Sequence, residues 1–587
     1  MIAFPIAVLS CFGLAQRLIG SERKNTSFTL AVAAAFFCLT FSTICTTLAL
    51  CNLLTERFLW PTTAVLIFAS MIYGRKRFQR LFDLDAVLIL IATIPYFLMA
   101  MVPIWYRDSL TYHASMAKLY ANTGGFDHGD LIVFSFFPQS WHSFLAGWMV
   151  LFPDGHFRFL GPWMALFCLW AVFGIARQMH ASRGQAALAT ALIWLMPTFM
   201  EFGTSLYVQN ALILFATLAF YWAANENKRV IILSGICAGF CASLKLSGLY
   251  ILLLIALWRL WKRSFLAEFV ISAAMFAAPF YIRNFIDTGN PFFPMMWSLF
   301  GGAGWDEWRA MAYEETLRGY GAGRDLIDFM LLPLRVFLTR DLIQQFQGSI
   351  GPVVLALIGW GAYKNKDPFW RFVLPAWGLI WAFNVQQIRF LMPIVPAALA
   401  VNMHLGPQKK HWIALPLLLG AIWSFEPTMH LWNRQATSEI LSQRMTKDDF
   451  LRQKLPENYP VTEWLNQQAH RKVWLVWMRG YHYYLDKPAR IDNVFGAWRF
   501  EALLEEVQSP QEFKNRLRAD GIDAVVINHR FFLQDDNADT REGRTEELRR
   551  RFQGILDAAA LNVAYSNGPI TVYSLSESES SLRESSN

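Results

Sequence analysis

The stretch "WYRDSLTYH", residues 105–113, places an acid, a phenol and an imidazole directly after an apolar segment. If the residues after Asp108 are helical, Tyr112 and His113 lie about one turn from it. A carboxylate held in this way can act as a general base, which typically contributes about 10²–10⁴-fold to a rate. The alternative is that Asp108 caps the helix that follows. Arg107, Tyr112 and His113 are candidates for contacting a substrate.

Three cations stand at the ends of other apolar segments: Lys245 in "GFCASLKLSGLY", Arg283 in "FYIRNFIDTGNP" and Arg389 in "QQIRFLMP". A lysine deep in a bilayer costs roughly 2.5–3.5 kcal/mol unless it faces a partner or a cavity. Each cation alone can be explained by snorkelling to the interface. Together they predict one electropositive pocket, where a phosphate about 4 Å from a cation gains roughly 4 kcal/mol before desolvation. The neighbouring Asn284 and Gln387 are further substrate-binding candidates.

Metal and nucleotide chemistry find little support. The loop after Asp108 contains His113, His128, His142, His156, Asp127, Asp130 and Asp154. Their spacing matches no zinc signature, so a metal site is a minor alternative and no cofactor is expected to be required. His142, in "FPQSWHSFL", is a substrate-binding candidate instead. The sequence has no P-loop, no dinucleotide-binding GxGxxG after a strand and no GxSxG elbow in a suitable context.

The composition indicates that membrane helices position these residues. Of the 587 residues, 55% are hydrophobic and only 16% are charged, whereas a soluble protein is about 25% charged. The net charge of +8 lies largely in short loops and not on a basic face with interleaved aromatics, which argues against nucleic-acid binding. The seven cysteines lie in or beside apolar segments, with no CxxC pair. The N-terminus lacks a basic region and is read as a retained span and not a cleaved signal peptide.

Hydropathy predicts about fourteen membrane spans. They lie near residues 2–18, 27–50, 58–73, 85–104, 157–176, 184–200, 208–224, 229–245, 247–261, 266–286, 348–363, 370–386, 390–405 and 411–425. The basic loops fall on alternate sides of this count, which assigns their face to the cytoplasm and both termini to the periplasm. The interrupted stretch 132–152 is interpreted as re-entrant or interfacial.

We therefore expect an α-helical polytopic membrane protein with juxtamembrane helices on its outer face and a small C-terminal periplasmic α/β domain. "KVWLVW" (472–477) and "DAVVIN" (523–528) are its strand-like segments. The predicted divisions are additional helices at 1–84, a catalytic core at 85–426 with outer loops at 105–156 and 287–345, the α/β domain at 427–574, and a disordered tail at 575–587.

In chain order, "RDSLTYH", "GFCASLKLSGL", "RNFIDTGNPFFP" and "QIRFLMPIVP" resemble the motifs of GT-C membrane glycosyltransferases. This class includes lipid A aminoarabinose transferase and protein O-mannosyltransferases, and the resemblance covers about residues 85–430. It implies a polyprenyl-phosphate-linked sugar donor, an acceptor on the outer side and inversion at the anomeric carbon. Asp108 would be the base, and Lys245 would hold the donor phosphate with Arg389 and Arg283. This chemistry requires no metal.

The chain departs from the family pattern at two positions. Relatives commonly carry a second acid further into the first loop, where this chain has His142. Many also carry an Asp after the third core span, where this chain reads "SLYVQN", with Gln209 and Asn210. Asp127 or Asp130 is a candidate for the missing carboxylate.

The leading hypothesis is a bacterial inner-membrane glycosyltransferase that modifies an envelope glycan, lipid or protein. One alternative is an O-antigen ligase or polymerase, which relies on outer-loop Arg and His without an early Asp. The other is a transporter or flippase for lipid-linked sugars, which would place polar residues near the bilayer midplane in repeated halves. The polar residues of this chain gather at one face instead.

Overall fold

The computed structural model describes residues 3–19, 25–74, 83–127, 133–153, 155–303, 305–340, 345–406, 408–478, 481–491, 497–533 and 544–575. His128, Asp130, Asp154 and residues 576–587 of the predicted tail lie outside this part of the chain. The chain divides into two compact units. Unit 1 comprises Met1–Val102, Pro138–Arg283 and Glu314–Arg444, and unit 2 comprises Pro103–Phe137, Asn284–Tyr313 and Met445–Asn587.

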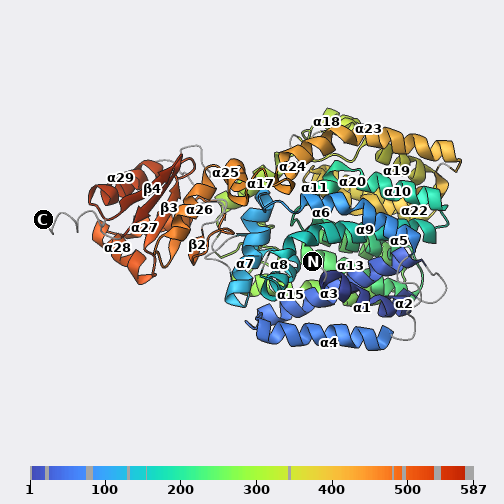
Figure 1. Ribbon diagram of the computed structural model, residues 1–587, viewed down its shortest axis with the longest axis horizontal. Helices are drawn as coiled ribbons and strands as arrows, with labels where there is room; N and C mark the ends of the chain where they lie inside the picture. Colours follow the sequence, from blue (N-terminus) through green and yellow to red (C-terminus); the bar gives the residue numbers. More distant parts are fainter. Residues whose placement is uncertain are drawn as a thin grey trace. The chain divides into compact units, whose positions relative to one another are not determined.

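Unit 1 is helical (Figure 1). Its elements are α1 (Ala3–Ser10), α2 (Phe12–Ile19), α3 (Thr26–Leu50), α4 (Glu56–Gly74), α5 (Leu84–Ala92), α6 (Ile94–Met99), α8 (Ser140–Leu151), η3 (His156–Phe159), α9 (Leu160–Gln178), α10 (Arg183–Trp194), α11 (Pro197–Gly203), α12 (Gln209–Ala223), α13 (Lys228–Leu244), α14 (Gly248–Lys262), α18 (Leu326–Leu338), α19 (Pro352–Lys364), α20 (Pro368–Phe383), α21 (Ile388–Leu391), η4 (Met392–Ile394), α22 (Val395–Asn402), η5 (Met403–Leu405), α23 (Lys410–Arg434) and α24 (Thr437–Leu441). The unit boundary falls within α15 (Leu266–Thr288) and α17 (Glu307–Arg318).

Five helical stretches of the described residues are long and apolar enough to cross a membrane, and a sixth is counted if the bent pair α10 and α11 forms one span. The bend of 71° falls where Pro197 begins α11, because proline has no N–H to continue the helical ladder. Other expected spans form shorter apolar helices, such as Ala3–Ile19 and Leu84–Met99. The structure thus has several apolar helices, but it does not confirm the predicted count of about fourteen.

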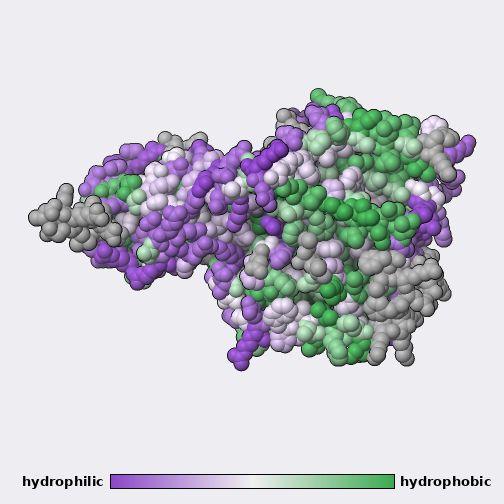
Figure 2. Space-filling view, viewed as in Figure 1, coloured by the Kyte–Doolittle hydropathy of each residue, from purple (hydrophilic) through white to green (hydrophobic). Residues whose placement is uncertain are grey.

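Large apolar side chains cover much of the surface of unit 1 (Figure 2). On α4, α15 and α23 respectively, Phe68 is 67% exposed, Ile271 67% and Phe425 68%. A water-soluble monomer rarely exposes contiguous apolar surface of this kind. These helix faces are suited to lipid, in agreement with an integral membrane protein.

Unit 2 combines helices with a five-stranded sheet (Figure 1). Its elements are η1 (Ser109–His113), α7 (Ala114–Thr123), η2 (Val133–Phe136), α16 (Trp297–Phe300), α25 (Lys447–Lys454), α26 (Asn458–Gln467), β1 (Val473–Val476), β2 (Ala489–Ile491), α27 (Trp498–Glu506), α28 (Pro510–Ala519), β3 (Ala524–Asn528), α29 (Arg544–Asp557), β4 (Asn562–Asn567) and β5 (Ile570–Ser574). The strands predicted in "KVWLVW" and "DAVVIN" are confirmed as β1 and β3.

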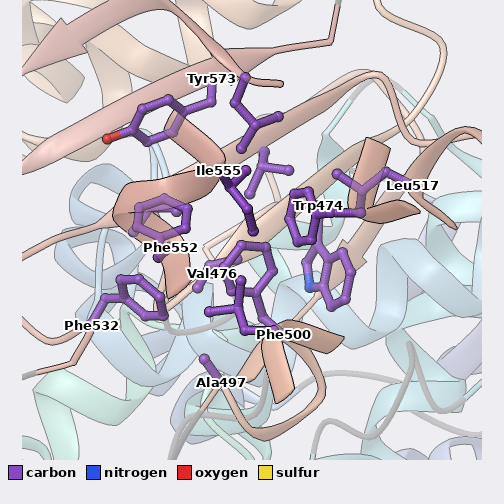
Figure 3. Packing of buried hydrophobic residues seen from close by; sticks show 14 of the residues in the cluster. Trp474, Val476, Ala497, Phe500, Leu517, Phe532, Phe552, Ile555 and Tyr573 are labelled. Atoms are coloured by element: carbon purple, nitrogen blue, oxygen red, sulfur yellow. The ribbon is translucent and has the colours of Figure 1, made fainter. Parts of the chain in front are cut away.

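The strand order is β2-β1-β3-β5-β4, with β1 parallel to β2 and β3, and β5 antiparallel to β3 and β4. Every residue of β1 and β3 is buried, which explains why both strands are nearly continuous apolar runs. Trp474 of β1, Phe500 of α27 and Phe552 of α29 pack together in the core between sheet and helices (Figure 3).

Candidate active site

Asp108 lies in unit 2, immediately before the π-helical turn η1 that continues into α7. Its backbone is already helical (φ −65°, ψ −31°), and its side chain makes no capping hydrogen bond. The helix-cap interpretation of Asp108 is therefore wrong. The Tyr112 hydroxyl instead donates a hydrogen bond to Asp108 Oδ2 at 3.2 Å. Single π turns within helices are frequently found at functional sites.

The side chains that follow Asp108 hold Tyr112 in place. The Tyr112 ring stacks on Phe134, with 4.4 Å between centroids, and it lies 4.1 Å from the His113 ring. His113 is buried, whereas Arg107 is exposed. The phenol that contacts the carboxylate therefore has a defined orientation, and Asp108 itself is only half-buried.

Lys245 lies in unit 1, at the point where α13 ends. Its extended backbone (φ −159°, ψ 145°) terminates the helix, and Gly248 then starts α14 against the last turn of α13. A Cβ atom at Gly248 would lie 2.1 Å from the Cys241 carbonyl oxygen, so only glycine permits this turn. The half-buried Lys245 ammonium lies 4.6 Å from the centroid of the Phe390 ring.

Arg389 approaches the same ring from α21. Its guanidinium carbon lies 5.4 Å from the Phe390 centroid, and its Nε donates to Gln387 Oε1 at 2.7 Å. Gln387 is fully buried and donates in turn to Gln347 Oε1 at 2.6 Å. Gln387 therefore acts as a support for Arg389. The structure brings Lys245 and Arg389 together on Phe390, and two half-buried cations on one ring favour an anion beside them.

The remaining predicted residues have different surroundings. Arg283 is half-buried near the end of α15, two residues after Tyr281, whose hydroxyl donates to the Ala242 carbonyl of α13 at 2.9 Å. Asn284 is buried in unit 2 and donates to the Phe136 carbonyl at 2.5 Å and, more weakly, to the Pro291 carbonyl at 3.4 Å. These contacts tie the Asn284 amide to two backbone carbonyls, and its contact with a substrate stays a prediction. His142 is buried in the short helix α8.

Three residues near the Lys245 end of the helices have buried side-chain polar atoms without hydrogen-bond partners among the described residues. They are Gln209 and Asn210, in the first turn of α12, and Ser247, in the turn after Lys245. The start of α12 lies beside the end of α13, because Cys241 Sγ donates to the Leu212 carbonyl at 3.8 Å. In the sequence pattern, these amides stand out only as a departure from the family. Adjacent amides that open an apolar segment are the signal that could have found them.

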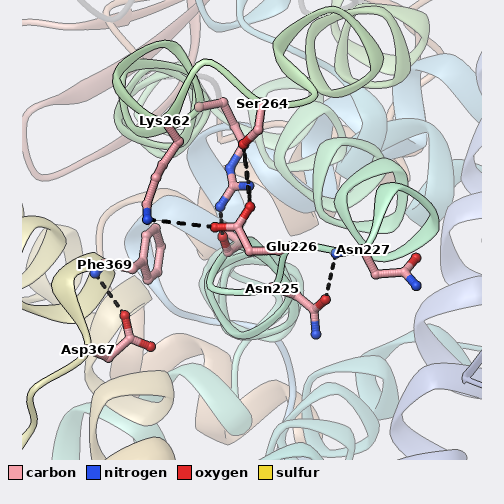
Figure 4. Close-up of polar contacts among 9 residues, drawn as sticks. Asn225, Glu226, Asn227, Lys262, Ser264, Asp367 and Phe369 are labelled. Carbon is pink, nitrogen blue, oxygen red and sulfur yellow. Dashed lines mark hydrogen bonds and ion pairs between the residues drawn. The ribbon is translucent and has the colours of Figure 1, made fainter.

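A second group of cations lies at the other ends of α13 and α14, where acidic side chains and backbone carbonyls are its partners (Figure 4). Arg259 is fully buried and donates to the Ala223 carbonyl at 2.5 Å and to Glu226 Oε2 at 3.4 Å, and Lys262 lies 4.0 Å from Glu226. The Trp258 ring packs on Phe369 of α20, with 5.5 Å between centroids. Asp367, in the loop before α20, caps that helix by accepting from the Phe369 N–H at 2.9 Å. Three of the basic loops predicted to be cytoplasmic, at residues 225–229, 259–263 and 363–371, therefore meet at one end of unit 1, away from Lys245.

Metal ligands do not gather in the described residues. Within that part of the chain, no three His, Cys, Asp or Glu side chains are grouped so that they could hold a metal ion. All seven cysteines are free thiols, and only Cys51 is exposed.

The sequence matches two family models, and the fold is similar to that of solved structures. Residues 1–395 match the family model described as Domain of unknown function (DUF8201), and residues 446–544 match a model described as SF2091/S2213. The crystal structure of ArnT from Cupriavidus metallidurans bound to undecaprenyl phosphate has a TM-score of 0.54 and 13% identity, and the match covers 84% of this chain and 98% of ArnT. The same protein in the apo state has a TM-score of 0.52, 12% identity and equal coverage. No curated protein matches the chain in sequence.

The likeness to ArnT extends through most of both chains, so this protein shares the fold of ArnT, and the structural resemblance expected from the motifs is confirmed. The match over residues 1–395 identifies the chain as a member of the family described as Domain of unknown function (DUF8201).

Proposed function

We propose that this protein is a membrane glycosyltransferase that moves a sugar from an undecaprenyl-phosphate-linked donor to an acceptor of the cell envelope. The observation that carries the proposal is the pair of cations, Lys245 and Arg389, which lie 4.6 and 5.4 Å from the centroid of the Phe390 ring. The fold is shared with ArnT, which binds undecaprenyl phosphate. Two cations beside an aromatic ring suit the binding of a phosphate that joins a sugar to an apolar chain.

The donor phosphate is bound by Lys245 and Arg389, and Arg283 adds a third positive charge from the end of α15. When the bond between the anomeric carbon and the phosphate oxygen breaks, the leaving oxygen gains negative charge. Fixed cations stabilise that charge more in the transition state than in the bound donor, which lowers the barrier. Gln387 contributes by holding the Arg389 guanidinium through the 2.7 Å hydrogen bond.

Asp108 is the general base. The acceptor hydroxyl gives its proton to the Asp108 carboxylate while its oxygen forms the new bond to the anomeric carbon, and the undecaprenyl phosphate leaves with the bonding electron pair. Attack opposite the phosphate inverts the anomeric carbon. Tyr112 orients the carboxylate through its hydrogen bond to Oδ2. Arg107, exposed next to the acid, is a candidate for contact with the acceptor.

Gln209, Asn210 and Ser247 supply neutral hydrogen-bonding groups near Lys245 and are proposed to contact the sugar hydroxyls. Amides and hydroxyls can both donate and accept, as sugar hydroxyls do. Burying these groups without protein partners costs about 1–3 kcal/mol each. A bound sugar that completes their hydrogen bonds would offset this cost.

The proposed setting is the inner membrane of a bacterium, with about fourteen spans, both termini in the periplasm and the acceptor on that side. The α/β part of unit 2, after residue 444, is then periplasmic, and the cluster around Arg259 faces the cytoplasm. The acceptor is an envelope glycan, lipid or protein.

The test uses purified protein and undecaprenyl phosphate as the probe. Lys245→Ala should weaken binding by about tenfold or more, since a hydrogen bond to a charged group is worth about 1.5–3 kcal/mol and about 1.4 kcal/mol is tenfold in affinity. Lys262→Ala is the matched control, because Lys262 also packs on aromatic rings, at 5.3 and 5.7 Å, but at the opposite end. Unchanged affinity in Lys245→Ala would remove the phosphate-site assignment.

Transfer from a panel of undecaprenyl-phosphate sugars tests the base. Asp108→Asn should abolish release of undecaprenyl phosphate while leaving its binding intact. Full turnover in this variant would favour an O-antigen ligase or polymerase mechanism, which has no early acid. Binding and translocation of a lipid-linked sugar with no transfer would instead favour a transporter.

A further inference from the structure

Residues 481–486 of unit 2, "YHYYLD", contact the segment that carries Asp108. We call them the YHYYLD segment. The Lys118 ammonium of α7 donates to the backbone carbonyls of Tyr483 at 2.8 Å and Leu485 at 2.9 Å, and it lies 3.5 Å from Asp486 Oδ1. These three acceptors match the three N–H donors of a lysine ammonium. Lys118 therefore ties α7 to the YHYYLD segment in a defined geometry.

Two further contacts come from the same segment. The buried His482 donates from Nε2 to the Ser115 carbonyl at 3.2 Å, because a carbonyl can only accept. The Tyr484 hydroxyl donates to the Ile104 carbonyl at 2.7 Å. The contacts with residues 104, 115 and 118 therefore fall on both sides of Asp108 in the sequence.

The YHYYLD segment is itself anchored to the C-terminal α/β part of the chain. Asn466 of α26 donates from Nδ2 to the Tyr484 carbonyl at 2.9 Å, and its Oδ1 accepts from the Asp486 N–H at 2.9 Å. The segment begins shortly after β1, the central strand of the parallel part of the sheet. Its backbone position is therefore set by the α/β fold.

A second layer supports the residues just before Asp108. Trp105 packs edge-to-face on Phe450 of α25, with 6.3 Å between centroids. Lys454, also in α25, lies 5.3 Å from the centroid of the Trp105 ring. Both contacts tie the chain three residues before Asp108 to the C-terminal part of unit 2.

We propose that the C-terminal α/β segment holds Asp108 in its catalytic position, with the YHYYLD segment as the brace and Lys118, His482 and Tyr484 as positioning residues. This rests on the proposed function only for the role of Asp108. The acid precedes a π turn, which departs from regular helix geometry, so contacts on both sides must fix its direction. Burial also lowers the pKa of Lys118, a cost that a merely structural helix could avoid with an apolar residue.

Hydrogen exchange in the full-length protein tests the brace without any substrate. In Lys118→Met, amides in residues 104–120 should exchange about tenfold faster than in the wild type, because local opening becomes easier. Tyr484→Phe should show a smaller increase, and Lys118→Arg, which still donates to carbonyls, should restore protection. Arg518→Met is the control, since Arg518 is an exposed cation on α28. Wild-type exchange in both Lys118→Met and Tyr484→Phe would overturn the proposal.

Kinetics separate positioning from acceptor recognition. With an undecaprenyl-phosphate sugar that the wild type uses, Lys118→Met should lower kcat by about tenfold to 100-fold, with KM for donor and acceptor nearly unchanged and activity regained in Lys118→Arg. A rise in acceptor KM at constant kcat would overturn positioning and assign the segment to acceptor binding. If Asp108→Asn retains transfer, the proposed role of Asp108 as general base is wrong. The exchange result still decides whether the YHYYLD segment stabilises residues 104–120.

Discussion

The buried amides of α12 give a prediction in which stability and activity move in opposite directions. Gln209 and Asn210 are 1% and 0% exposed, and none of their four polar side-chain atoms has a hydrogen-bond partner among the described residues. The perturbation is the pair of near-isosteric apolar substitutions, Gln209→Met and Asn210→Leu. Each keeps the side-chain volume while removing the polar atoms, so packing changes little.

The expected magnitude follows from the cost of an unsatisfied buried group, about 1–3 kcal/mol. Allowing about 1 kcal/mol for imperfect packing of the new side chain, each variant should gain up to about 2 kcal/mol in the free energy of unfolding. Transfer should fall by about tenfold, because the loss of one hydrogen bond to a sugar hydroxyl is worth about 1.4 kcal/mol. Affinity for undecaprenyl phosphate should not change, since Lys245 and Arg389 are intact.

The assay combines thermal unfolding in detergent with the transfer and binding measurements. Thr217→Val is the matched control: Thr217 lies in the same helix, is 1% exposed, and its hydroxyl also has no partner within the described residues. This variant should gain stability and keep full transfer activity, because Thr217 lies about two turns from the start of α12.

Two results would refute the reasoning. Destabilisation of Gln209→Met and Asn210→Leu by 2 kcal/mol or more, as in ordinary core variants, would mean that the amides are satisfied within the protein. Stabilisation with undiminished transfer would mean that the amides are not part of the sugar site.

Two further predictions concern a glycine and two histidines. Gly248→Ala should weaken undecaprenyl phosphate binding and lower the unfolding temperature. The added Cβ would lie 2.1 Å from the Cys241 carbonyl oxygen and would shift the turn that carries Lys245. Gly378→Ala should keep both properties, because a Cβ added at Gly378 would have no neighbouring atom within 4 Å. In unit 2, burial lowers the pKa of His470 and His529 from 6.5, so the unfolded chain binds protons that the folded chain does not, and the free energy of unfolding should fall as the pH drops below 6.5. Thermal unfolding between pH 7.5 and 5 would show this loss, and a constant unfolding temperature would contradict it.

Hydropathy succeeded where an apolar run is continuous and failed where local backbone chemistry interrupts it. The predicted span 27–50 is one helix, α3, over Thr26–Leu50. The predicted span 184–200 is two helices that meet at 71°, because Pro197 cannot continue the helical hydrogen bonds of α10. A sliding window measures how apolar a segment is and does not register where its backbone hydrogen bonds must end.

In the candidate site, some residues can be predicted from their type and position in the sequence, whereas others are identified only by their packing in the structure. Lys245 and Arg389 were predicted because a cation at the end of an apolar segment is costly. Phe390 was not predicted, because an aromatic residue there is equally well explained by a lipid contact. Its role depends on the turn at Gly248 and on the buried support of Gln387. Both depend on close contacts that spacing along the chain does not encode, so substitutions at Gly248 and Gln387 should affect phosphate binding although neither residue carries a charge.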